Sequence, residues 1–381
     1  LNARAETGEP YMINIDRCNE SLPQEQKDLG LRINQSNLCS EIVLPTNEER
    51  TAVCCLSSVN LEHFDKWKKD EQFIDDLITM LDNVLEHFIE AIVDTSGLGG
   101  YNANFKRFKN YVRKEKEGLV KAAYSAYRER SLGLGAMGFH AYLQSKGLPF
   151  QSLQSTSNNH VMFSHIKKKS LEATRRLAEE RGEAPDVHGS SKRNAHLLAI
   201  APNASSSIIC GGTSPSIEPF RANSFTHKTL SGSYQVRNKF LDKLLKKKGL
   251  TIKEREKIWK DIAGSSGSVQ HLDILDDNEK EIFKTAPEIN QIYLVEHAHM
   301  RQEYICQSQS VNLFFTMPKA TEPQEVHDDY LQYVNDVHWY AMNKLKSLYY
   351  FRSDAARSAE NVNIKIPRVK LEDVDCLSCE G

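Results

Sequence analysis

The sequence lacks long apolar runs and any excess of charge of one sign. No uninterrupted apolar stretch approaches the ~18 residues that a membrane-spanning helix needs, and no charged and then apolar leader opens the chain. The 49 basic and 51 acidic residues give a formal net charge of -2, so no overall field favours nucleic acid. Cysteine is scarce as well, because eight in 381 residues are too few for a disulfide scaffold. We therefore expect a soluble, cytoplasmic protein with reduced thiols that binds neither membranes nor nucleic acid.

What is present is the composition of an ordinary globular protein, with 40% apolar and 26% charged residues. Three-to-four apolar spacing predicts amphipathic helices, and short apolar runs between turn residues predict strands. We expect helices over 65–93, up to Arg130, over 240–285 with a joint at 264–267, and over 326–346, and strands near 37–41, 197–200 and 305–315. The first helix should bury one stripe, formed by Phe73, Leu77, Leu81, Val84, Phe88 and Ile92. This alternation of strands and helices favours an α/β architecture.

Two glycine-containing segments need separate interpretation. Gly133–Gly138 has the G-x-G-x-x-G spacing of dinucleotide-binding loops. However, no buried strand pattern precedes it, and no acidic residue between Ser131 and Ser170 is available to hold a ribose. We therefore expect close backbone packing here rather than a cofactor site. Gly211–Glu218 has the composition of a tight, exposed loop.

The segment Asn37-Leu38-Cys39-Ser40-Glu41 combines an amide, a thiol and a carboxylate at two-residue spacing. In an extended segment these three side chains would project to one side, because successive side chains alternate between faces. A redox-capable sulfur and a carboxylate base could then meet one small substrate. The alternative is a buried cysteine in a strand whose polar neighbours face solvent, since cysteine is among the most buried residue types.

A second candidate site follows the short apolar run at 197–200. The residues Pro202-Asn203-Ala204-Ser205-Ser206-Ser207 place few side-chain obstacles over the backbone N–H groups. If a helix begins here, its free amides and dipole would form an anion site. The alternative is a serine-rich helix N-cap or loop.

The remaining cysteines and a tyrosine pair complete the set of candidates. Cys376 and Cys379 form a C-x-x-C near the end of a polar stretch, so they could close a disulfide, carry reducing equivalents on a mobile tail, or supply half of a zinc site. Cys54 and Cys55 are neighbours, and neighbouring cysteines rarely bond each other. A cavity thiol such as Cys54 could be oxidised in turnover and re-reduced by the tail. Adjacent tyrosines such as Tyr349-Tyr350 are usually ordinary core or surface aromatics.

Taken together, five separated motifs resemble the large, catalytic subunit of class I ribonucleotide reductases. The motifs, in order, are Asn37–Glu41, Cys54–Leu61, Pro202–Ser207, Leu348–Tyr350 and the Cys376/Cys379 pair. The resemblance covers nearly the whole chain. It implies an α/β fold, the second half of a ten-stranded α/β barrel with a central finger loop near 37–41, plus helical additions. It also implies a half-barrel over 1–360 and a flexible, redox-active tail over 361–381.

The resemblance implies a role for each motif residue in reducing a ribonucleoside diphosphate. Cys39 matches the thiyl-radical residue that abstracts the 3′ hydrogen, and Glu41 matches the base for the 3′-hydroxyl proton. Asn37 matches the amide that positions substrate hydroxyls, and Cys54 matches one of two thiols that reduce the 2′ carbon. The substrate-binding residues implied by position are Leu38, Ser40, Asn203, Ala204, Ser205, Ser206 and Ser207, the last five as a diphosphate loop.

The same resemblance implies partners rather than a resident cofactor. Tyr349 and Tyr350 look like the last steps of a radical relay from a metal-containing small subunit. Cys376 and Cys379 resemble the pair that re-reduces the active site and is itself recharged by thioredoxin or glutaredoxin. No metal or cofactor is expected to bind this chain directly.

One departure from the family concerns what precedes the finger loop. Only 36 residues precede Asn37, whereas in the family a complementary half-barrel with the partner thiol of Cys54 comes first. We expect a complementary N-terminal half, supplied by a split subunit or lost by truncation. Cys18, Cys210 and Cys306 match no catalytic role and are expected to be buried thiols. A non-catalytic assembly or regulatory fragment, or a zinc- or dithiol-binding protein, are the alternatives.

Overall fold

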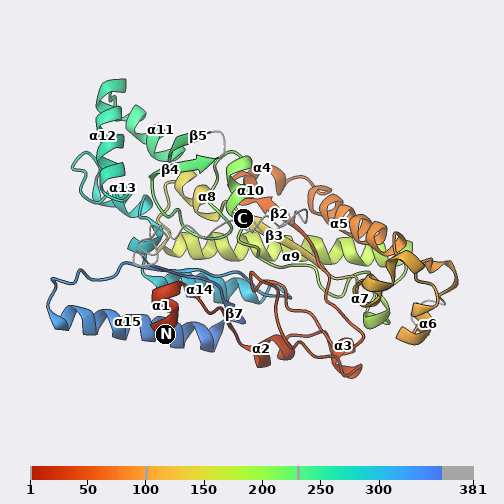
Figure 1. Ribbon diagram of the computed structural model, residues 1–381. Coiled ribbons are helices and arrows are strands. Elements are labelled where there is room, and N and C mark those ends of the chain that lie inside the picture. Colours follow the sequence, from red (N-terminus) through yellow and green to blue (C-terminus); the bar gives the residue numbers. More distant parts are fainter. Residues whose placement is uncertain (1, 99–101, 230–231, 354–381) are drawn as a thin grey trace.

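The computed structural model describes residues 2–98, 102–229 and 232–353 (Figure 1). Its central feature is a ladder of short parallel segments. Strand β2 (Cys55–Asn60) pairs in parallel with β3 (Leu132–Met137). Leu134 in β3 is paired with Leu198, and Ile200 is paired with Gln309, both in parallel. The segment 197–200, where a strand was expected, continues the ladder beside β3 through a single bridge, and the segment near Gln309 lies beside it in turn; the expected strand over 305–315 is reduced to β6 (Leu313–Phe315).

Glycine allows the two sides of β3 to approach their neighbours closely. A Cβ on Gly133 would lie 2.4 Å from Leu56 Cδ2, and a Cβ on Gly135 would lie 2.6 Å from the carbonyl oxygen of Ala199. Every residue of β3 is buried, as is usual for a parallel strand covered on both faces. The expectation of close backbone packing at Gly133–Gly138 is therefore confirmed.

Helices cover the ladder on one side, led by α9 (Leu153–Arg181), which lies beside α5 (Phe73–Glu90) (Figure 1). The expected single helix over 65–93 was wrong, because α4 (Phe64–Trp67) ends before a polar stretch in which Asp70 accepts a hydrogen bond from the Gln72 backbone. The predicted apolar stripe was also rotated. The residues that α5 buries are Ile74, Ile78, Leu81, Asp82, Leu85 and Ile89, whereas Val84 is 52% exposed.

The first sixty residues contain short elements and long connections. They are α1 (Asn2–Thr7), β1 (Met12–Ile13), α2 (Ile15–Glu20) and α3 (Gln24–Asp28). No strand forms at 37–41, so that expectation was wrong. The strand β1 pairs with β7 (Ser347–Leu348) in antiparallel fashion, which joins the beginning of the described chain to its end.

The middle of the chain supplies helices and turns around the ladder. They are η1 (Leu61–His63), η2 (Thr95–Gly97), α6 (Phe105–Lys109), η4 (Lys114–Leu119), α7 (Val120–Glu129), α8 (Phe139–Ser145), η5 (Pro185–Val187) and α10 (Ala204–Ile209). The helix α7 ends at Arg130 in a left-handed C-cap, as expected. The segment 211–218 is not an exposed loop, because Ser214, Ser216, Ile217 and Glu218 are buried. Hydrogen bonds from Gly138 N and Ala141 N to Ser214 hold it against the start of α8.

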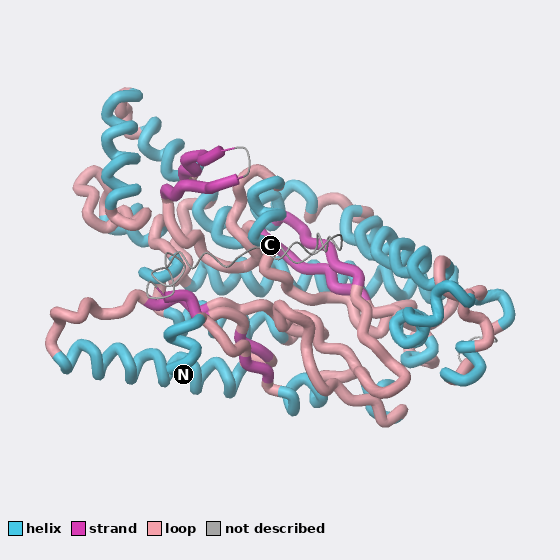
Figure 2. Tube along the Cα trace, in the orientation of Figure 1, coloured by secondary structure: helices cyan, strands magenta, loops and turns pink. Residues whose placement is uncertain are grey.

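The last part forms two further packed regions. A helical extension with its own apolar core contains α11 (Lys239–Lys247), α12 (Ile252–Gly264) and α13 (Asp277–Ile282), next to the hairpin β4 (Ser224–Thr229) and β5 (Gly232–Arg237). The other region contains η6 (Ala286–Glu288), α14 (Gln291–Gln302), β6, α15 (Gln324–Lys344), β7 and β8 (Phe351–Ser353). Figure 2 shows how short the strands are beside the helices. The helix expected over 326–346 is confirmed as α15, whereas the region 240–285 contains three helices with breaks at 248–251 and 265–276, the second of which includes most of the expected joint at 264–267.

The described residues form a short parallel ladder covered by helices, and they form no closed barrel. Within these ranges no helix has both the length and the apolar character needed to cross a bilayer. The tail over 361–381, with Cys376 and Cys379, lies outside the described residues, so the predicted domain boundary at 360 stays a prediction.

Candidate active site

The segment Asn37–Glu41 folds as a turn rather than an extended strand. Ser40 N donates to the carbonyl oxygen of Asn37 at 3.2 Å, and Ser40 adopts a left-handed backbone with φ 63°. Asn37 closes the turn, because its Oδ1 accepts a hydrogen bond from Ile42 N at 3.1 Å. The turn still brings the Asn37 amide to the Glu41 carboxylate, through a side-chain hydrogen bond. The expected meeting of these two groups is present, although by a different backbone route.

Glu41 is a buried carboxyl group, with only 2% of its surface exposed. Ser310 Oγ lies 3.1 Å from Glu41 Oε2 and 2.6 Å from the carbonyl oxygen of Cys39. Burial raises the pKa of Glu41, and the hydrogen bonds from Asn37 and Ser310 oppose that rise. A carboxylate with a raised pKa is a better proton acceptor near neutral pH than an exposed one.

Cys39 lies against the first of the two adjacent tyrosines. Its Sγ is 3.4 Å from the hydroxyl oxygen of Tyr349. Tyr349 is 5% exposed, and burial followed by the hydrogen bond with Cys39 raises its pKa, so the phenol is neutral. The rings of Tyr349 and Tyr350 have centroids 4.4 Å apart at an angle of 56°. The residues predicted to form a relay are therefore in direct contact, while their roles stay predictions.

A third tyrosine joins this pair, and sequence reasoning missed it. The ring of Tyr11 is 4.6 Å from the ring of Tyr349 and 4.9 Å from that of Tyr350, centroid to centroid. The pairing of Met12 with Leu348 brings it there. A two-residue pairing between distant segments leaves no periodic signal in the sequence that could have revealed this contact.

Cys54 lies beside the residues that follow the finger-loop turn. Its Sγ accepts a hydrogen bond from Gln307 Nε2 at 3.3 Å, and the Oε1 of Gln307 accepts one from Val43 N at 3.3 Å. Burial raises the pKa of Cys54 well above its usual value. Cys55 packs instead against the main helical core, so the two neighbouring thiols have different surroundings.

The predicted diphosphate loop precedes and opens α10, so a helix does begin there. Asn203 has a left-handed backbone, and its amide exchanges hydrogen bonds with Ser58 Oγ rather than capping the helix. Ala204, Ser205 and Ser206 are exposed, whereas Ser207 is buried and donates to the carbonyl oxygen of Ala204. The loop therefore offers exposed small residues at the start of a helix.

The other two predicted contact residues differ in exposure. Leu38 is 63% exposed at the tip of the turn, while Ser40 is buried. The Oγ of Ser40 has no hydrogen-bond partner among the described residues. A buried hydroxyl without a partner is a group that a ligand or another segment can satisfy.

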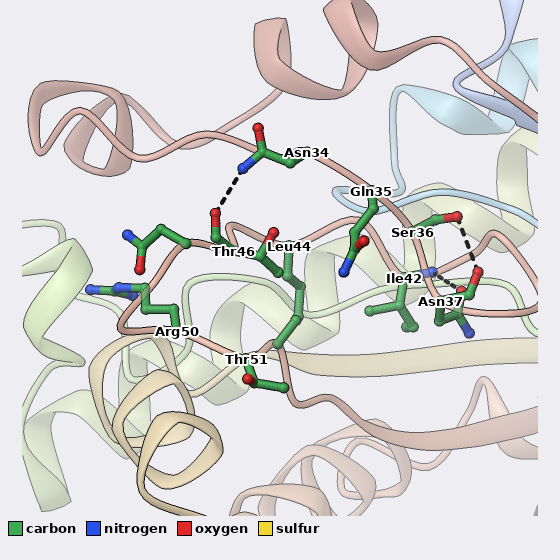
Figure 3. A pocket seen from close by; sticks show the side chains of 11 residues that line it. Asn34, Gln35, Ser36, Asn37, Ile42, Leu44, Thr46, Arg50 and Thr51 are labelled. Carbon is green, nitrogen blue, oxygen red and sulfur yellow. Dashed lines mark hydrogen bonds between the residues drawn. The ribbon is translucent and has the colours of Figure 1, made fainter.

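A cavity of about 450 Å³ lies along the flank of the finger loop (Figure 3). Its lining residues are Asn34, Gln35, Ser36, Asn37, Ile42, Leu44, Thr46, Asn47, Arg50, Thr51 and Ala52. Figure 3 shows Asn37 at one end and Arg50 at the other, where Arg50 forms a buried ion pair with Asp186. Of the predicted site residues that the structure describes, Asn37 alone lines this cavity, and the others lie outside it.

Two further ionisable groups near the site have shifted pKa values; Glu218 was not recognised in the sequence, and Cys306, expected to be a buried thiol, is only partly buried. Glu218 is 5% exposed, accepts a hydrogen bond from Asn312 N at 3.1 Å, and has its pKa raised to about 7 by burial. Asn312 Oδ1 in turn accepts a hydrogen bond from Tyr350 N at 3.0 Å. Burial opposes ionisation of the partly buried Cys306 thiol, but the neighbouring His196 and Lys167 and a hydrogen bond donated by Leu197 N at 3.1 Å lower its pKa to about 5. The prediction of a buried thiol was wrong for Cys210, which is exposed, because it follows the short α10 at the surface.

The sequence matches a known family over most of its length. The family described as "Ribonucleotide reductase, barrel domain" matches residues 1–192 and 186–351. The chain belongs to this family. Within the described residues, the ribonucleotide reductase barrel fold is represented by the parallel ladder and its covering helices.

Individual relatives agree with this assignment. The ribonucleoside-diphosphate reductase large subunit of Invertebrate iridescent virus 3 is 47% identical over 385 residues, covering 99% of this chain and 55% of the relative. The large subunit of Arabidopsis thaliana is 30% identical, covering 97% of this chain and 47% of the relative. The solved structure of the Actinobacillus ureae class Id ribonucleotide reductase alpha subunit superposes with a TM-score of 0.76 at 37% identity, covering 94% of this chain and 61% of that one. The chain thus spans about half the length of the curated relatives it matches.

Proposed function

We propose that this chain carries the radical site of a ribonucleoside-diphosphate reductase and acts together with a complementary N-terminal half of the large subunit. The observation that carries the proposal is the contact of Cys39 Sγ with the Tyr349 hydroxyl at 3.4 Å, beside the buried carboxyl group of Glu41. Once that phenol has been oxidised to a phenoxyl radical, a thiol in contact with it can pass it a hydrogen atom. A base within the same turn can take a proton from the substrate.

In the proposed reaction, an oxidised Tyr349 takes the hydrogen atom of the Cys39 thiol. The resulting thiyl radical abstracts the 3′ hydrogen of a ribonucleoside diphosphate, and Glu41 takes the 3′-hydroxyl proton. The 2′ hydroxyl leaves as water, and Cys54 with a partner thiol supplies two electrons and two protons while closing a disulfide. Cys39 then returns its hydrogen atom to the 3′ carbon, Glu41 returns its proton to the 3′ oxygen, and the Cys39 thiyl regains a hydrogen atom from Tyr349. Asn37 orients the substrate hydroxyls and the Glu41 carboxylate.

Substrate binding is assigned to two exposed or unsatisfied groups of residues. The start of α10, residues Asn203–Ser207, would hold the diphosphate through backbone N–H groups and hydroxyls. Leu38 at the tip of the turn and the unpartnered Ser40 hydroxyl would complete the contacts near the ribose. The exposure of Ala204, Ser205 and Ser206 supports this assignment.

The proposed partners follow from the same chemistry. A metal-containing small subunit would deliver the radical to Tyr350, and thioredoxin or glutaredoxin would recharge Cys376 and Cys379, which lie outside the described residues. The cytoplasm is the compartment in which such thiols are kept reduced. No metal or cofactor is assigned to this chain itself.

Replacing Cys39 by Ala in the enzyme assembled from both large-subunit halves and the small subunit tests the proposal. We expect no deoxyribonucleotide product, with ribonucleoside diphosphate binding retained, because the substituted methyl group cannot carry a hydrogen atom. Product would be measured by chromatography and binding by calorimetry. Cys210→Ala is the matched control, since this thiol is exposed and outside the site, and it should keep activity.

Product from the Cys39→Ala enzyme would contradict the radical role. Absence of product from the assembled wild-type enzyme would instead favour a non-catalytic assembly or regulatory fragment. Stoichiometric zinc in the purified chain that is lost in a Cys376→Ala variant would favour the zinc- or dithiol-binding alternative.

A further inference from the structure

Among the described residues, Tyr11 is the one aromatic side chain that touches both relay tyrosines and has no role in the proposed reaction. Its contact with Tyr349 is tilted at 50°, and its contact with Tyr350 is edge-on at 82°. The position of Tyr11 is fixed by the strand pairing next to it. Tyr11 directly precedes β1, whose residue Met12 pairs with Leu348, one residue before the tyrosine pair.

The segment before Tyr11 is held in place from two sides. The guanidinium of Arg4 is 2% exposed and donates hydrogen bonds to the carbonyl oxygens of Pro10 and Tyr349, the latter at 3.1 Å. Phe351 N donates to the carbonyl oxygen of Gly8 at 3.0 Å. Residues 8–11 are therefore fixed against the tyrosine pair by backbone contacts that do not depend on the Tyr11 hydroxyl.

The hydroxyl groups in this cluster form a directed chain. Tyr11 Oη donates to Glu9 Oε1 at 3.0 Å, which uses its one proton. The Tyr350 side chain lies within hydrogen-bonding reach of Tyr11, and because the Tyr11 proton is directed to Glu9, a hydrogen bond between the two phenols takes its proton from Tyr350. Burial first, and then the hydrogen bond to Glu9, raise the pKa of Tyr11, which keeps it a neutral phenol that can both accept and donate. Glu9 at the end of the chain is exposed to solvent.

The other face of Tyr350 carries a positive charge. The guanidinium carbon of Arg352 lies 3.8 Å from the centroid of the Tyr350 ring. This arrangement favours the neutral ring but repels the positive charge that would develop if an electron left the phenol and the proton stayed. Oxidation of Tyr350 therefore requires a proton acceptor at the moment when the electron leaves.

We propose that Tyr11 and Glu9 form a proton-accepting branch of the tyrosine relay, an inference that rests on the proposed function. When Tyr350 is oxidised, its electron reduces the radical of the small subunit. Its phenolic proton moves to Tyr11 Oη, and the Tyr11 proton moves to the Glu9 carboxylate. Tyr350 then takes a hydrogen atom from Tyr349. When the radical returns to the small subunit, the proton on Glu9 returns through Tyr11 to Tyr350.

The test uses Tyr11→Phe and Glu9→Gln in the assembled enzyme. Tyr11→Phe keeps the ring contacts and removes the hydroxyl, and Glu9→Gln keeps the exposed side chain and removes the proton acceptor. We expect kcat to fall by about tenfold or more in both, toward the range typical of a lost proton-transfer group. KM for the substrate and affinity for the small subunit should be unchanged, and the solvent deuterium isotope effect on kcat should change. Glu6→Gln, an exposed carboxylate in the same segment, should behave as wild type.

Several results would overturn the inference. One is wild-type kcat in Glu9→Gln, which alters no packed group. Another is a loss of activity in Tyr11→Phe explained fully by weaker substrate or small-subunit binding. If both variants keep wild-type activity, the proton branch is refuted and the proposed function is not. If the assembled wild-type enzyme forms no product, the proton branch and the proposed function are both refuted.

Discussion

Burial determines which protonation states the acidic residues near the site adopt. Glu41 and Glu218 both have raised pKa values because their carboxyl groups are almost completely withdrawn from water. A carboxyl group with a raised pKa holds a proton in the folded state that the unfolded chain releases. Each such group therefore makes folding less favourable as the pH rises through that interval.

Glu218→Gln tests this effect where it is largest. The folded protein holds the Glu218 proton up to about pH 7, whereas an ordinary glutamate releases it near 4.5. The wild-type protein therefore loses stability as the pH rises between these values. The side-chain amide of the variant can still accept the hydrogen bond from Asn312 N and avoids this loss. At pH 8 we expect the variant to be more stable by up to about 3 kcal/mol, with a difference that shrinks by pH 5. Urea unfolding at pH 5 and pH 8 measures this difference in stability. A variant that is less stable than wild type at pH 8 would refute the prediction.

Single residues also show what the sequence could and could not reveal about the site. The residue types at Asn37, Cys39 and Glu41 drew attention to this segment, because an amide, a thiol and a carboxylate follow one another there at two-residue spacing, and their chemical roles stay predictions. The predicted extended backbone of this segment was wrong, because a left-handed residue is usually recognised in a sequence as a glycine and here it is Ser40. Tyr11 was missed because nothing local distinguishes it from any other tyrosine.

Among the elements, a buried ion cluster fixes α5 to its neighbours. Asp82 is fully buried, and its carboxylate accepts from Arg130 after α7, from Arg181 at the end of α9, and from Arg193. Asn194 adds a fourth donor at 3.0 Å. Burial opposes ionisation of Asp82, but Arg130 and Arg193 outweigh it and lower its pKa. The contribution of the Asp82 carboxylate to the stability of the folded protein is therefore present at neutral pH and is lost as the pH falls.

Asp82→Asn should destabilise the protein by about 3–5 kcal/mol at pH 7, because Arg130 and Arg193 would stay buried with less opposing charge. Thermal or urea unfolding measures the change. Asp76→Asn is the matched control, since Asp76 lies in the same helix and is exposed, and it should change stability by less than about 0.5 kcal/mol. Equal effects of the two substitutions would show that the ion cluster does not hold α5 in place.

Gly135→Ala tests the close approach within the ladder. The added Cβ would lie 2.6 Å from the carbonyl oxygen of Ala199, so one of the neighbouring segments must move. We expect a loss of roughly 1–3 kcal/mol, which is typical of overpacking in a full core. Gly118→Ala places the same atom in open space and should be neutral or slightly stabilising. A Gly135→Ala protein as stable as wild type would mean that the ladder adjusts without strain.

At the scale of the whole molecule, the ladder is an incomplete wall. Within the described ranges, β2 pairs with β3 along one edge, and its other edge has no strand partner. Leu56 in β2 is partly exposed. Open strand edges and exposed apolar groups are the features that a complementary half of a barrel would cover.

Hydrogen–deuterium exchange can detect this covering. Addition of a complementary N-terminal half should slow exchange of β2 amides, because edge N–H groups would gain partners. Amides of β3, which already lies between β2 and the segment at 197–200, serve as the internal control and should not change. Unchanged exchange in β2 on formation of a stable complex would place the contact elsewhere.

The overall architecture was more predictable than its details. Apolar periodicity located α7, α11, α12 and α15 closely enough to give an α/β assignment, whereas the long helix α9 was not predicted. It failed for the stripe on α5, where two adjacent apolar rows compete and tertiary contacts with α9 select the other one. It also failed for 211–218, whose small polar residues are buried by hydrogen bonds to the start of α8 that no local pattern encodes.

The antiparallel pairing of β1 with β7 has a consequence for the order of folding. The cluster of Tyr11, Tyr349 and Tyr350 draws its members from opposite ends of the described chain, so a ribosome must release nearly all of it before these rings can meet. An incompletely synthesised chain can therefore form much of the ladder before these three rings meet, so this contact is one of the last in the described chain to close.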